Sequence, residues 1–396
     1  MIINREITPY LKALTEQFPV VALMGPRQSG KTTLVKETFA HYAYVSLEDL
    51  DRRSAALNDP RGFFATYAHR PGLIIDEIQE VPELLSYMQG IVDQSYRPGY
   101  FIVISSQHFL MYEKITQTLA GRIALLTLLP LSVNELAVAK LLPADAESML
   151  IKGCYPRLYV QPIEVGTWCS NYISTYVEKD VRAVLQVTDV VAFQRFLKLC
   201  AARVGNLINY ASLARDADIA PNTVKAWLSI LEASYIIKLL SPYYKNFNKR
   251  VIKSPKLYFY DSALVCSLLG IRTTEEIYMH PLRGALFESF VVSELFKYSF
   301  NRNEQPHIYF WRDAQGHEID IIIEKSFDRT IPIEIKASMT PTDDFFKGLT
   351  EWRAISGQAD AQSYVVYAGM QNFEYSKGKV IGWTGIDAVL NTIYGY

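Results

Sequence analysis

The stretch FPVVALMGPRQSGKTTLVKETF constrains this chain most, because it joins an apolar strand to a helix through a glycine-rich turn. The expected strand covers residues 20–24, and the turn has the spacing Gly25-x-x-x-x-Gly30-Lys31-Thr32. Glycines let the backbone curl so that its N–H groups point inward at phosphate oxygens, and the N-terminus of the following helix favours negative charge. The pattern therefore predicts a P-loop nucleotide-binding fold.

The P-loop pattern gives its residues specific chemical roles. Lys31 is expected to reach the β- and γ-phosphates of ATP, and the Thr32 hydroxyl is expected to bind Mg²⁺. The expected nucleotide-binding set is Gly25, Pro26, Arg27, Gln28, Ser29, Gly30, Lys31, Thr32 and Thr33. A chance glycine-rich turn is the alternative, but the flanking strand and helix favour the P-loop.

A pair of carboxylates ends another apolar strand. The segment RPGLIIDEIQEVPELL places Asp76 and Glu77 directly after its apolar residues. Beside a P-loop, Asp76 would hold the Mg²⁺ shell, and Glu77 would polarise the attacking water as a catalytic residue. A solvated strand end is the alternative, and the presence of the P-loop favours the catalytic interpretation.

Three more apolar segments complete the expected parallel sheet, and the first of them is YAYVSLED, which follows the helix after the P-loop. The segment YFIVISSQHF ends in Ser105, Ser106 and Gln107, whose polar groups suit contact with a γ-phosphate or with water. Arg122 precedes the fifth expected strand. Arg122 could act catalytically on a nucleotide, in cis or across a subunit boundary, or it could pair with a surface carboxylate. The sequence leaves these alternatives open.

The order of the motifs is similar to that of a known family. GPRQSGKTTL, LIIDEIQEVPELL, LAGR and LPLSVNEL are followed by YVEKDVRAVLQV, LEASYIIKLLSPYYKNFNKRVIKSPKLYFYDSAL and GALFESFVVSEL. Along nearly its whole length, the chain resembles a group of prokaryotic AAA+-type ATPases that carry a C-terminal domain of unknown function. The resemblance implies nucleotide binding and, with Arg122, a homo-oligomer. Members of that family usually carry Gly-Ser where this chain has Ser105-Ser106.

Length and composition indicate several domains. At 396 residues the chain is too long for one core, and with 49% apolar residues it can bury more than one. We expect an AAA+-like P-loop ATPase domain over residues 1–148 and a helical and winged-helix domain over residues 149–275. An α/β restriction-endonuclease-like domain is expected over residues 276–396. The expected fold class is therefore multidomain α/β.

Charge and cysteine usage exclude other classes. The formal net charge of −1 restricts any nucleic-acid contact to a local basic patch. The four cysteines are scattered without C-x-x-C spacing, which argues against a zinc ribbon or a disulfide framework. MIINREITPYLKALTEQ lacks the apolar centre of a secretory signal, and no apolar run reaches the roughly 20 residues that cross a bilayer. We therefore expect a cytoplasmic protein with no membrane partner.

The middle region has the rhythm of a helix-turn-helix motif. INYASLARDADIAPNTVKAWLSILEASYII predicts a short helix, a turn near Asp218 and a second helix that opens at Pro221. Asn222, Thr223 and Lys225 would lead this second helix into a DNA groove. DNA is therefore an expected partner.

A basic and aromatic stretch follows, in which two strands would form a wing. Its basic residues are Lys245, Lys249, Arg250, Lys253 and Lys256. A basic wing favours duplex DNA, because each neutralised phosphate releases counterions. Winged helices also serve as protein–protein or interdomain packing modules, so this second interpretation stays open.

Residues 317–338, HEIDIIIEKSFDRTIPIEIKAS, predict a β-hairpin with a charged face. Alternate side chains of a strand share a face, which groups Glu318 with Asp320 and Glu334 with Lys336. An edge hairpin whose charges face water is one interpretation. The other is a metal site, in which Asp320 and Glu334 hold a divalent cation, Mg²⁺ or Mn²⁺, and Lys336 activates the attacking water.

The helix RGALFESFVVSELFKYSF precedes this hairpin. Its polar edge is formed by Ser289, Ser293 and Lys297. Glu288 instead shares the apolar stripe, so its carboxylate is expected to point inward. A carboxylate aimed inward requires a partner, because burial of an unpaired charge is costly.

The helix and the hairpin together resemble the PD-(D/E)xK nuclease superfamily, with Ile319 where that superfamily usually has Pro. The resemblance implies Glu288, Asp320 and Glu334 as metal ligands. It implies Asp320, Glu334 and Lys336 as catalytic residues of phosphodiester hydrolysis.

Two functions remain open at this point. One is a Mg²⁺-dependent ATPase that acts on DNA through a winged helix and a metal-dependent nuclease-like domain. The other is a nucleotide-driven regulatory switch, whose nuclease-like domain is inactive and binds a partner. Three inward carboxylates within reach of one metal would favour the first function, and an arginine of the domain in that space would favour the second.

Overall fold

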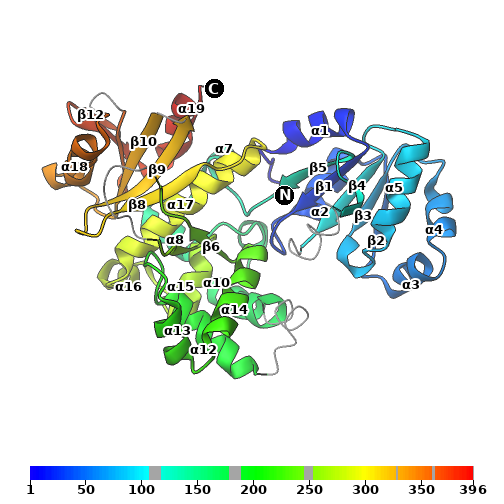
Figure 1. Cartoon of the computed structure of the whole chain (residues 1–396), viewed down its shortest axis with the longest axis horizontal. Helices are drawn as coiled ribbons and strands as arrows, with labels where there is room; N and C mark the ends of the chain where they lie inside the picture. Colours follow the sequence, from blue (N-terminus) through cyan, green and yellow to red (C-terminus); the bar gives the residue numbers. More distant parts are fainter. Residues whose placement is uncertain (107–116, 178–188, 245–252, 327–328, 359–361, 396) are drawn as a thin grey trace. The chain divides into compact units, whose positions relative to one another are not determined.

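The computed structural model describes residues 1–106, 117–177, 189–244, 253–326, 329–358 and 362–395 (Figure 1). The chain divides into two compact units. The first unit is Met1–Leu131, Ala233–Tyr235 and Ser299–Glu304, and the second unit is Ser132–Glu232, Ile236–Tyr298 and Gln305–Tyr396. The prediction of three domains stays a prediction.

The first unit is built on a five-stranded sheet with the order β2-β3-β4-β1-β5. Its strands are β1 (Val20–Met24), β2 (Ala43–Ser46), β3 (Leu73–Asp76), β4 (Phe101–Ser105) and β5 (Ile123–Thr127). All neighbouring strands pair in parallel, as the sequence predicts. Their near-continuous apolar runs suit a parallel sheet that helices cover on both faces.

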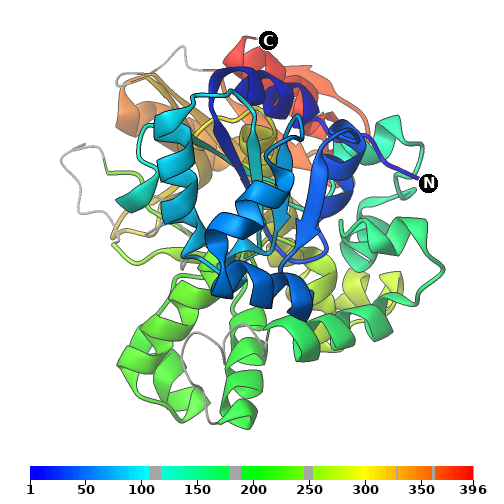
Figure 2. The ribbon, with the colours of Figure 1, turned by 90° about the vertical axis from the view of Figure 1, so that its right-hand side faces the viewer.

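Helices of the first unit bury both faces of this sheet. They are α1 (Thr8–Gln17), α2 (Lys31–Thr38), α3 (Leu50–Asn58), α4 (Pro60–Tyr67) and α5 (Leu84–Gln94), with a 3₁₀ turn at Ile78–Glu80. Val20 of β1 belongs to one core with Met88 of α5, whereas Val21 belongs to the opposite core with Leu11 of α1. Figure 2 shows α3, α4 and α5 in front of the strands that they cover.

The second unit begins with helices. They are α7 (Val133–Val138), α8 (Ala146–Lys152), α9 (Arg157–Val160), α10 (Val165–Tyr172) with a π-turn at Ile173–Val177, α12 (Val190–Ala201), α13 (Tyr210–Ala217) and α14 (Pro221–Ala233). The strands β6 (Ile237–Leu240) and β7 (Lys256–Phe259) follow and pair antiparallel. Next come α15 (Ser262–Leu269), α16 (Thr274–Met279) and α17 (Arg283–Asn301).

Helices α13 and α14 form the predicted helix-turn-helix order. Asp218 ends α13 in the left-handed conformation (φ 57°), and α14 begins at Pro221. Asn222 and Lys225 are exposed at the start of α14. The winged-helix class stays a prediction, because residues 245–252, between the two paired strands, lie outside the described ranges.

One basic residue of the expected wing is buried and cannot face a nucleic acid. Lys256, counted among the wing's cations, is only 3% exposed and forms ion pairs inside the unit. Lys253 is exposed. Lys245, Lys249 and Arg250 lie outside the described residues.

A six-stranded mixed sheet, ordered β12-β13-β11-β10-β9-β8, ends the second unit. Its elements are β8 (Ile308–Arg312), β9 (Glu318–Ser326), β10 (Arg329–Lys336), a 3₁₀ turn at Asp343–Phe346, α18 (Lys347–Ser356), β11 (Tyr364–Tyr367), β12 (Phe373–Tyr375), β13 (Gly378–Gly382), a 3₁₀ turn at Trp383–Gly385 and α19 (Ile386–Tyr394). The predicted hairpin is β9–β10, and it occupies the interior of the sheet. The interpretation as an edge hairpin is therefore wrong.

The polar edge of α17 is buried. Ser289 is 1% exposed and Ser293 is 3% exposed, and they donate hydrogen bonds to the carbonyl oxygens of Phe259 and Tyr260. Both hydroxyls thus satisfy backbone groups at the end of β7, which a polar edge facing solvent would not do.

Among the described helices, none combines the length and the apolar character needed to cross a bilayer.

Candidate functional site

The loop after β1 has the backbone conformation that its glycines permit. Gly25 has φ 146°, and a Cβ there would lie 2.1 Å from the carbonyl oxygen of Leu128. Gly30, with φ 98°, precedes the first residue of α2. A side chain at Gly25 would collide with the backbone, and both positions favour glycine by their positive φ. The predicted P-loop is therefore present as a strand–loop–helix unit.

Lys31 lies across this loop. Its ammonium donates hydrogen bonds of 2.9 Å and 2.8 Å to the carbonyl oxygens of Gly25 and Pro26, and the residue is 5% exposed. Ser29 is fully buried, and its Oγ has no hydrogen-bond partner among the described residues. A buried hydroxyl without a partner is costly, and an anion in the loop would relieve that cost. The loop thus suits a phosphate.

Arg5 fixes the loop from the side of α1. Its guanidinium donates to the carbonyl oxygen of Ser29 at 2.7 Å and to that of Leu129 at 2.7 Å. Arg5 is buried, and its rigid guanidinium links the P-loop to the chain that follows β5. Sequence reasoning missed Arg5, which lies far from both partners in the chain.

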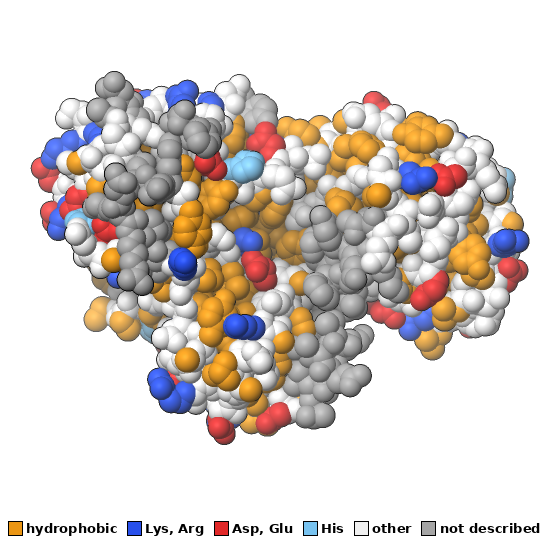
Figure 3. All heavy atoms as spheres, viewed as in Figure 1, with side chains coloured by type: hydrophobic (Ala, Val, Ile, Leu, Met, Phe, Trp, Pro, Cys, Tyr) orange, Lys and Arg blue, Asp and Glu red, His pale blue; other side chains and the backbone are white. Residues whose placement is uncertain are grey.

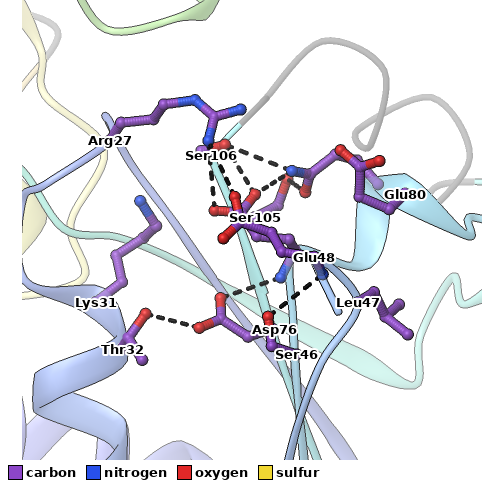
Figure 4. Close-up of polar contacts among 12 residues, drawn as sticks. Arg27, Lys31, Thr32, Ser46, Leu47, Glu48, Asp76, Glu80, Ser105 and Ser106 are labelled. Atoms are coloured by element: carbon purple, nitrogen blue, oxygen red, sulfur yellow. Dashed lines mark hydrogen bonds and ion pairs between the residues drawn. The ribbon is translucent and has the colours of Figure 1, made fainter. Parts of the chain in front are cut away.

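Asp76 joins the P-loop helix to the tip of β3 (Figure 4). Its Oδ2 accepts hydrogen bonds from the Thr32 hydroxyl at 2.7 Å and from the Tyr44 hydroxyl at 2.9 Å. Burial, followed by the charge of Asp76, raises the pKa of Tyr44 well above its ordinary value, so Tyr44 stays a donor. The two residues predicted to serve Mg²⁺, Thr32 and Asp76, are therefore in direct contact.

Glu77 lies beside Asp76 in a hydrogen-bonded group. Its Oε2 accepts from the Ser106 hydroxyl at 3.0 Å and from the Gln79 amide. Ser105 in turn donates to Gln79 Oε1 at 2.7 Å. Glu77 has φ 54°, a left-handed conformation that is uncommon outside glycine and is often found at functional sites. The predicted polar end of β4 thus orients Glu77, while Gln107 lies outside the described residues.

Two other P-loop residues differ in their surroundings. The Arg27 guanidinium is 3.9 Å from Glu77 Oε1 and 3.7 Å from Glu48 Oε1, and its side chain is 9% exposed. Figure 4 shows it on the same side of the site as Ser106. Thr33 is exposed. Arg27 thus brings positive charge next to the expected catalytic carboxylate.

Arg122 forms a two-pronged ion pair with Asp93 of α5. Its Nε lies 2.6 Å from Asp93 Oδ1, and its Nη2 lies 3.1 Å from Asp93 Oδ2. Both side chains are partly exposed. Of the alternatives left open, the structure shows the pairing with a surface carboxylate.

The carboxylates of the second unit have basic partners. Glu288 of α17 accepts from Lys256 Nζ at 2.9 Å and from the Tyr258 hydroxyl. Lys256 also pairs with Glu318 of β9, which Arg312 contacts at 3.2 Å. Burial raises the pKa of Glu288 to about 7, although Lys256 lowers it in part. Glu288 therefore points inward, as predicted, and its partner is a lysine.

The hairpin residues are held by other donors. Asp320 Oδ2 accepts from the backbone N–H of Ile335 at 2.8 Å, and Lys336 Nζ donates to Glu334 Oε2 at 2.5 Å. Burial raises the pKa of Glu334 to about 8, and the charge of Asp320 adds to that rise. Asp320, Glu334 and Lys336 thus lie within one hydrogen-bonded face of β9–β10.

The described ranges contain no group of three or more His, Cys, Asp or Glu side chains arranged to hold a metal ion. The assignment of Glu288, Asp320 and Glu334 as one metal site therefore stays a prediction without geometric support.

Family models match three segments of the chain. Residues 144–275 and 283–386 match models described as domains of unknown function (DUF8612 and DUF4143). Two curated relatives are uncharacterized proteins of Mycobacterium bovis and Mycobacterium tuberculosis. Each is 29% identical to this chain over 348 residues, which is 86% of this chain and 76% of the relative.

Solved structures show weaker likenesses. A Walker-type ATPase of Pyrococcus abyssi has 16% identity and a TM-score of 0.47, covering 67% of this chain and 96% of its own. RuvB of Thermotoga maritima has 16% identity and a TM-score of 0.30, covering 60% of this chain and 90% of its own. These scores are too low to add to the assignment. Residues 17–137 match the model described as an AAA domain, and with the P-loop geometry this match assigns them an AAA-type P-loop ATPase fold.

Proposed function

We propose that this protein binds ATP and hydrolyses it with Mg²⁺. The contact between Thr32 and Asp76 carries this proposal, because it joins the P-loop helix to the strand end that also bears Glu77. Oxygen ligands from a P-loop hydroxyl and a strand-end carboxylate are what Mg²⁺ uses in P-loop ATPases. Buried Lys31 supports phosphate binding in the same loop, and so does the Ser29 hydroxyl, which has no hydrogen-bond partner within the described ranges.

The residues have separate tasks in this proposal. The P-loop backbone, Ser29 and Lys31 hold the phosphates, while Thr32 and Asp76 hold Mg²⁺, which neutralises phosphate charge when bound. Glu77 takes a proton from the attacking water. Hydrogen bonds to its carboxylate fix its orientation before any nucleotide binds.

Phosphate release by the full-length protein tests this function. Lys31→Ala should lower ATP turnover by about 10²-fold or more, because one donor to the developing charge is lost. Lys12→Ala is the matched control, since Lys12 is exposed on α1 and away from the loop in sequence. Equal turnover in Lys31→Ala and Lys12→Ala would contradict the proposal.

We further propose that ATP turnover drives a switch, in which the second unit binds a partner. The carboxylates expected to hold a metal there are paired with protein donors, among them Lys256 and Lys336. A carboxylate face that is neutralised internally suits recognition better than metal-dependent hydrolysis. Metal-dependent cleavage at β9–β10 is the other hypothesis, and an assay of DNA cleavage with Mn²⁺ tests it.

DNA contact is a second candidate function, favoured by the exposed start of α14. Asn222 and Lys225 lie at the position where a recognition helix meets a groove. Among the described side chains on the face in Figure 3, Lys and Arg are interspersed with Asp and Glu, so the contact would be local. Such a contact would act with the ATPase and would not replace it.

Binding to duplex DNA at several salt concentrations tests this candidate. Lys225→Ala should make the slope of log affinity against log salt shallower by roughly one unit, because one phosphate contact is lost. Lys198→Ala, an exposed lysine of α12, is the control. Identical slopes in the two variants would remove the start of α14 from the DNA contact.

A further inference from the structure

We propose that Lys256 is a built-in cation that takes the place of a metal ion among the carboxylates of the second unit. This role is independent of the ATPase function. In this role Lys256, which lies outside the hairpin, neutralises the charge that a divalent cation would otherwise neutralise. The lysine thereby makes metal-dependent cleavage by β9–β10 unfavourable.

The position of Lys256 carries the proposal. Its ammonium comes from β7 and contacts Glu288 of α17 and Glu318 of β9. The side chain of Lys256 is 4% exposed, whereas that of Glu318 is 25% exposed. The ammonium therefore lies deeper than either carboxylate and occupies the position between them that a shared cation would take.

The other expected metal ligands are also occupied. Asp320 accepts from the backbone N–H of Ile335, and Glu334 accepts from Lys336. Helix α18 closes over Glu334, because a Cβ at Gly348 would lie 2.4 Å from Glu334 Oε1. A metal ion would have to break several protein contacts at once to bind all the carboxylates.

Electrostatics favour the lysine over an added divalent cation. The Lys256 ammonium lies 2.9 Å from Glu288 Oε1 and also pairs with Glu318, so it meets two carboxylates at once. A buried charge that loses its partner is strongly destabilising. A metal ion entering this cluster would be repelled by the ammonium or would leave it without a carboxylate.

The lysine also joins two parts of the chain. Lys256 belongs to the segment of residues 144–275, and its partners belong to the segment of residues 283–386. Tyr258, two residues further along the same strand, donates to Glu288 as well. The same side chain thus neutralises the cluster and ties β7 to α17 and β9.

Thermal unfolding with and without Mn²⁺ tests the proposal, in full-length Lys31→Ala protein without nucleotide. This background separates the result from metal bound with nucleotide at the P-loop. Lys256→Met should lower Tm by roughly 10 °C, because carboxylates lose a buried partner. Saturating Mn²⁺ should restore about 5 °C to this variant, since a ligand of the folded state stabilises it.

Three controls make the result specific. Lys253→Met, at an exposed neighbouring lysine, should change neither Tm nor the Mn²⁺ response. Adding Asp320→Asn or Glu288→Gln to Lys256→Met should remove the restoration by Mn²⁺. Failure of Mn²⁺ to stabilise a folded Lys256→Met protein would overturn the exchange of lysine for metal.

A further experiment uses protein that retains Lys256, so it does not depend on whether the Lys256→Met variant folds. In protein that retains Lys256, Mn²⁺ should not raise Tm in a saturable way through Asp320. Asp320→Asn should therefore leave the response to Mn²⁺ unchanged. The protein that retains Lys256 should also cleave neither duplex nor single-stranded DNA with Mn²⁺. A Mn²⁺ response or DNA cleavage that requires Asp320 in this protein would overturn the proposal and support the nuclease hypothesis.

Discussion

The hydroxyl of Thr32 donates a hydrogen bond of 2.7 Å to Oδ2 of Asp76, across 44 positions of sequence. Thr32 lies in the first turn of α2, and Asp76 is the last residue of β3. In a parallel sheet the carboxyl ends of the strands share one edge, so the two elements present their polar residues to the same place. The sequence near Thr32 specifies the P-loop helix, and the sequence near Asp76 specifies the end of the strand.

Asp76→Asn tests the expected role of this pair in Mg²⁺ binding. The amide keeps an oxygen that can accept from Thr32 and Tyr44, but it loses the hydrogen bond that Asp76 Oδ1 accepts from the Glu77 backbone N–H at 3.0 Å, so the thermal midpoint should fall by a few degrees. The lost negative charge should raise the Mg²⁺ concentration for half-maximal ATPase activity by about tenfold or more. Asp51→Asn, at an exposed residue of α3, is the control. Identical Mg²⁺ dependence in both variants would remove Asp76 from the metal site.

Glu77→Gln should separate ATP binding from hydrolysis. The amide cannot accept a proton from water, so turnover should fall by roughly 10²-fold or more while ATP affinity is retained. Glu80→Gln is a matched control, because Glu80 pairs with Arg53 at 2.8 Å and lies outside the Glu77 group. Turnover and equilibrium ATP binding are the two measurements. Normal hydrolysis by Glu77→Gln would show that another group is the base.

Gln79 acts as a positioning residue in this arrangement. Its amide contacts Glu77, and its carbonyl oxygen accepts from Ser105. Gln79→Ala should lower kcat about tenfold with little change in KM, because the loss of one hydrogen bond to a charged group costs roughly 1.5 kcal/mol. Gln94→Ala on α5 is the control, since Gln94 is exposed. A rise in KM alone would place Gln79 in substrate binding instead.

The first unit could be predicted closely, because its signals are local. The strand of residues 20–24 and the loop from Gly25 to Thr32 are consecutive in sequence, and the carboxylate pair directly follows an apolar run. Gln79 and Tyr44 were not predicted, since their roles depend on how β2, β3 and β4 approach one another. The sequence did contain a signal for Gln79, because this polar residue lies just after the carboxylates that end β3.

The second unit shows where the sequence misleads. Lys256 resembles its neighbours in a basic stretch, but its partner Glu288 lies 32 positions further on. Ser293 and Lys297 likewise belong to the polar edge that the sequence predicts for α17, and both are buried. From sequence, a polar residue is expected on the surface of the protein. That it is buried becomes clear only when a partner distant in sequence is known to pair with it. The hairpin itself was predicted correctly, because its alternation is local.

The ion pair of Arg122 with Asp93 leads to a prediction about self-association. If the pair is a surface contact, Arg122→Ala and Asp93→Ala should have equally small effects, below about 1 kcal/mol in stability. ATPase activity per protomer should then be independent of protein concentration, and we expect this outcome from the observed pairing. Activity lost only in Arg122→Ala, with a rate that rises with concentration, would instead assign Arg122 to a neighbouring subunit's nucleotide.

The pKa of Glu334 gives a prediction about stability and pH. Burial, then the charge of Asp320, raises this pKa from 4.5 to about 8, although Lys336 acts to lower it. The folded protein therefore binds this proton more tightly than the unfolded chain does. The resulting stability is complete below about pH 4.5 and is lost as the pH rises through about 8.

Glu334→Gln should remove this dependence, because the amide does not titrate. Between pH 5 and pH 8, the free energy of unfolding of the unsubstituted protein should fall relative to that of the variant, by at most roughly 1.4 kcal/mol per pH unit. Denaturant unfolding at several pH values measures the difference. Asp344→Asn, at an exposed residue before α18, should keep the original profile. Parallel profiles for Glu334→Gln and the unsubstituted protein would show that Glu334 ionises alike in the folded and unfolded states.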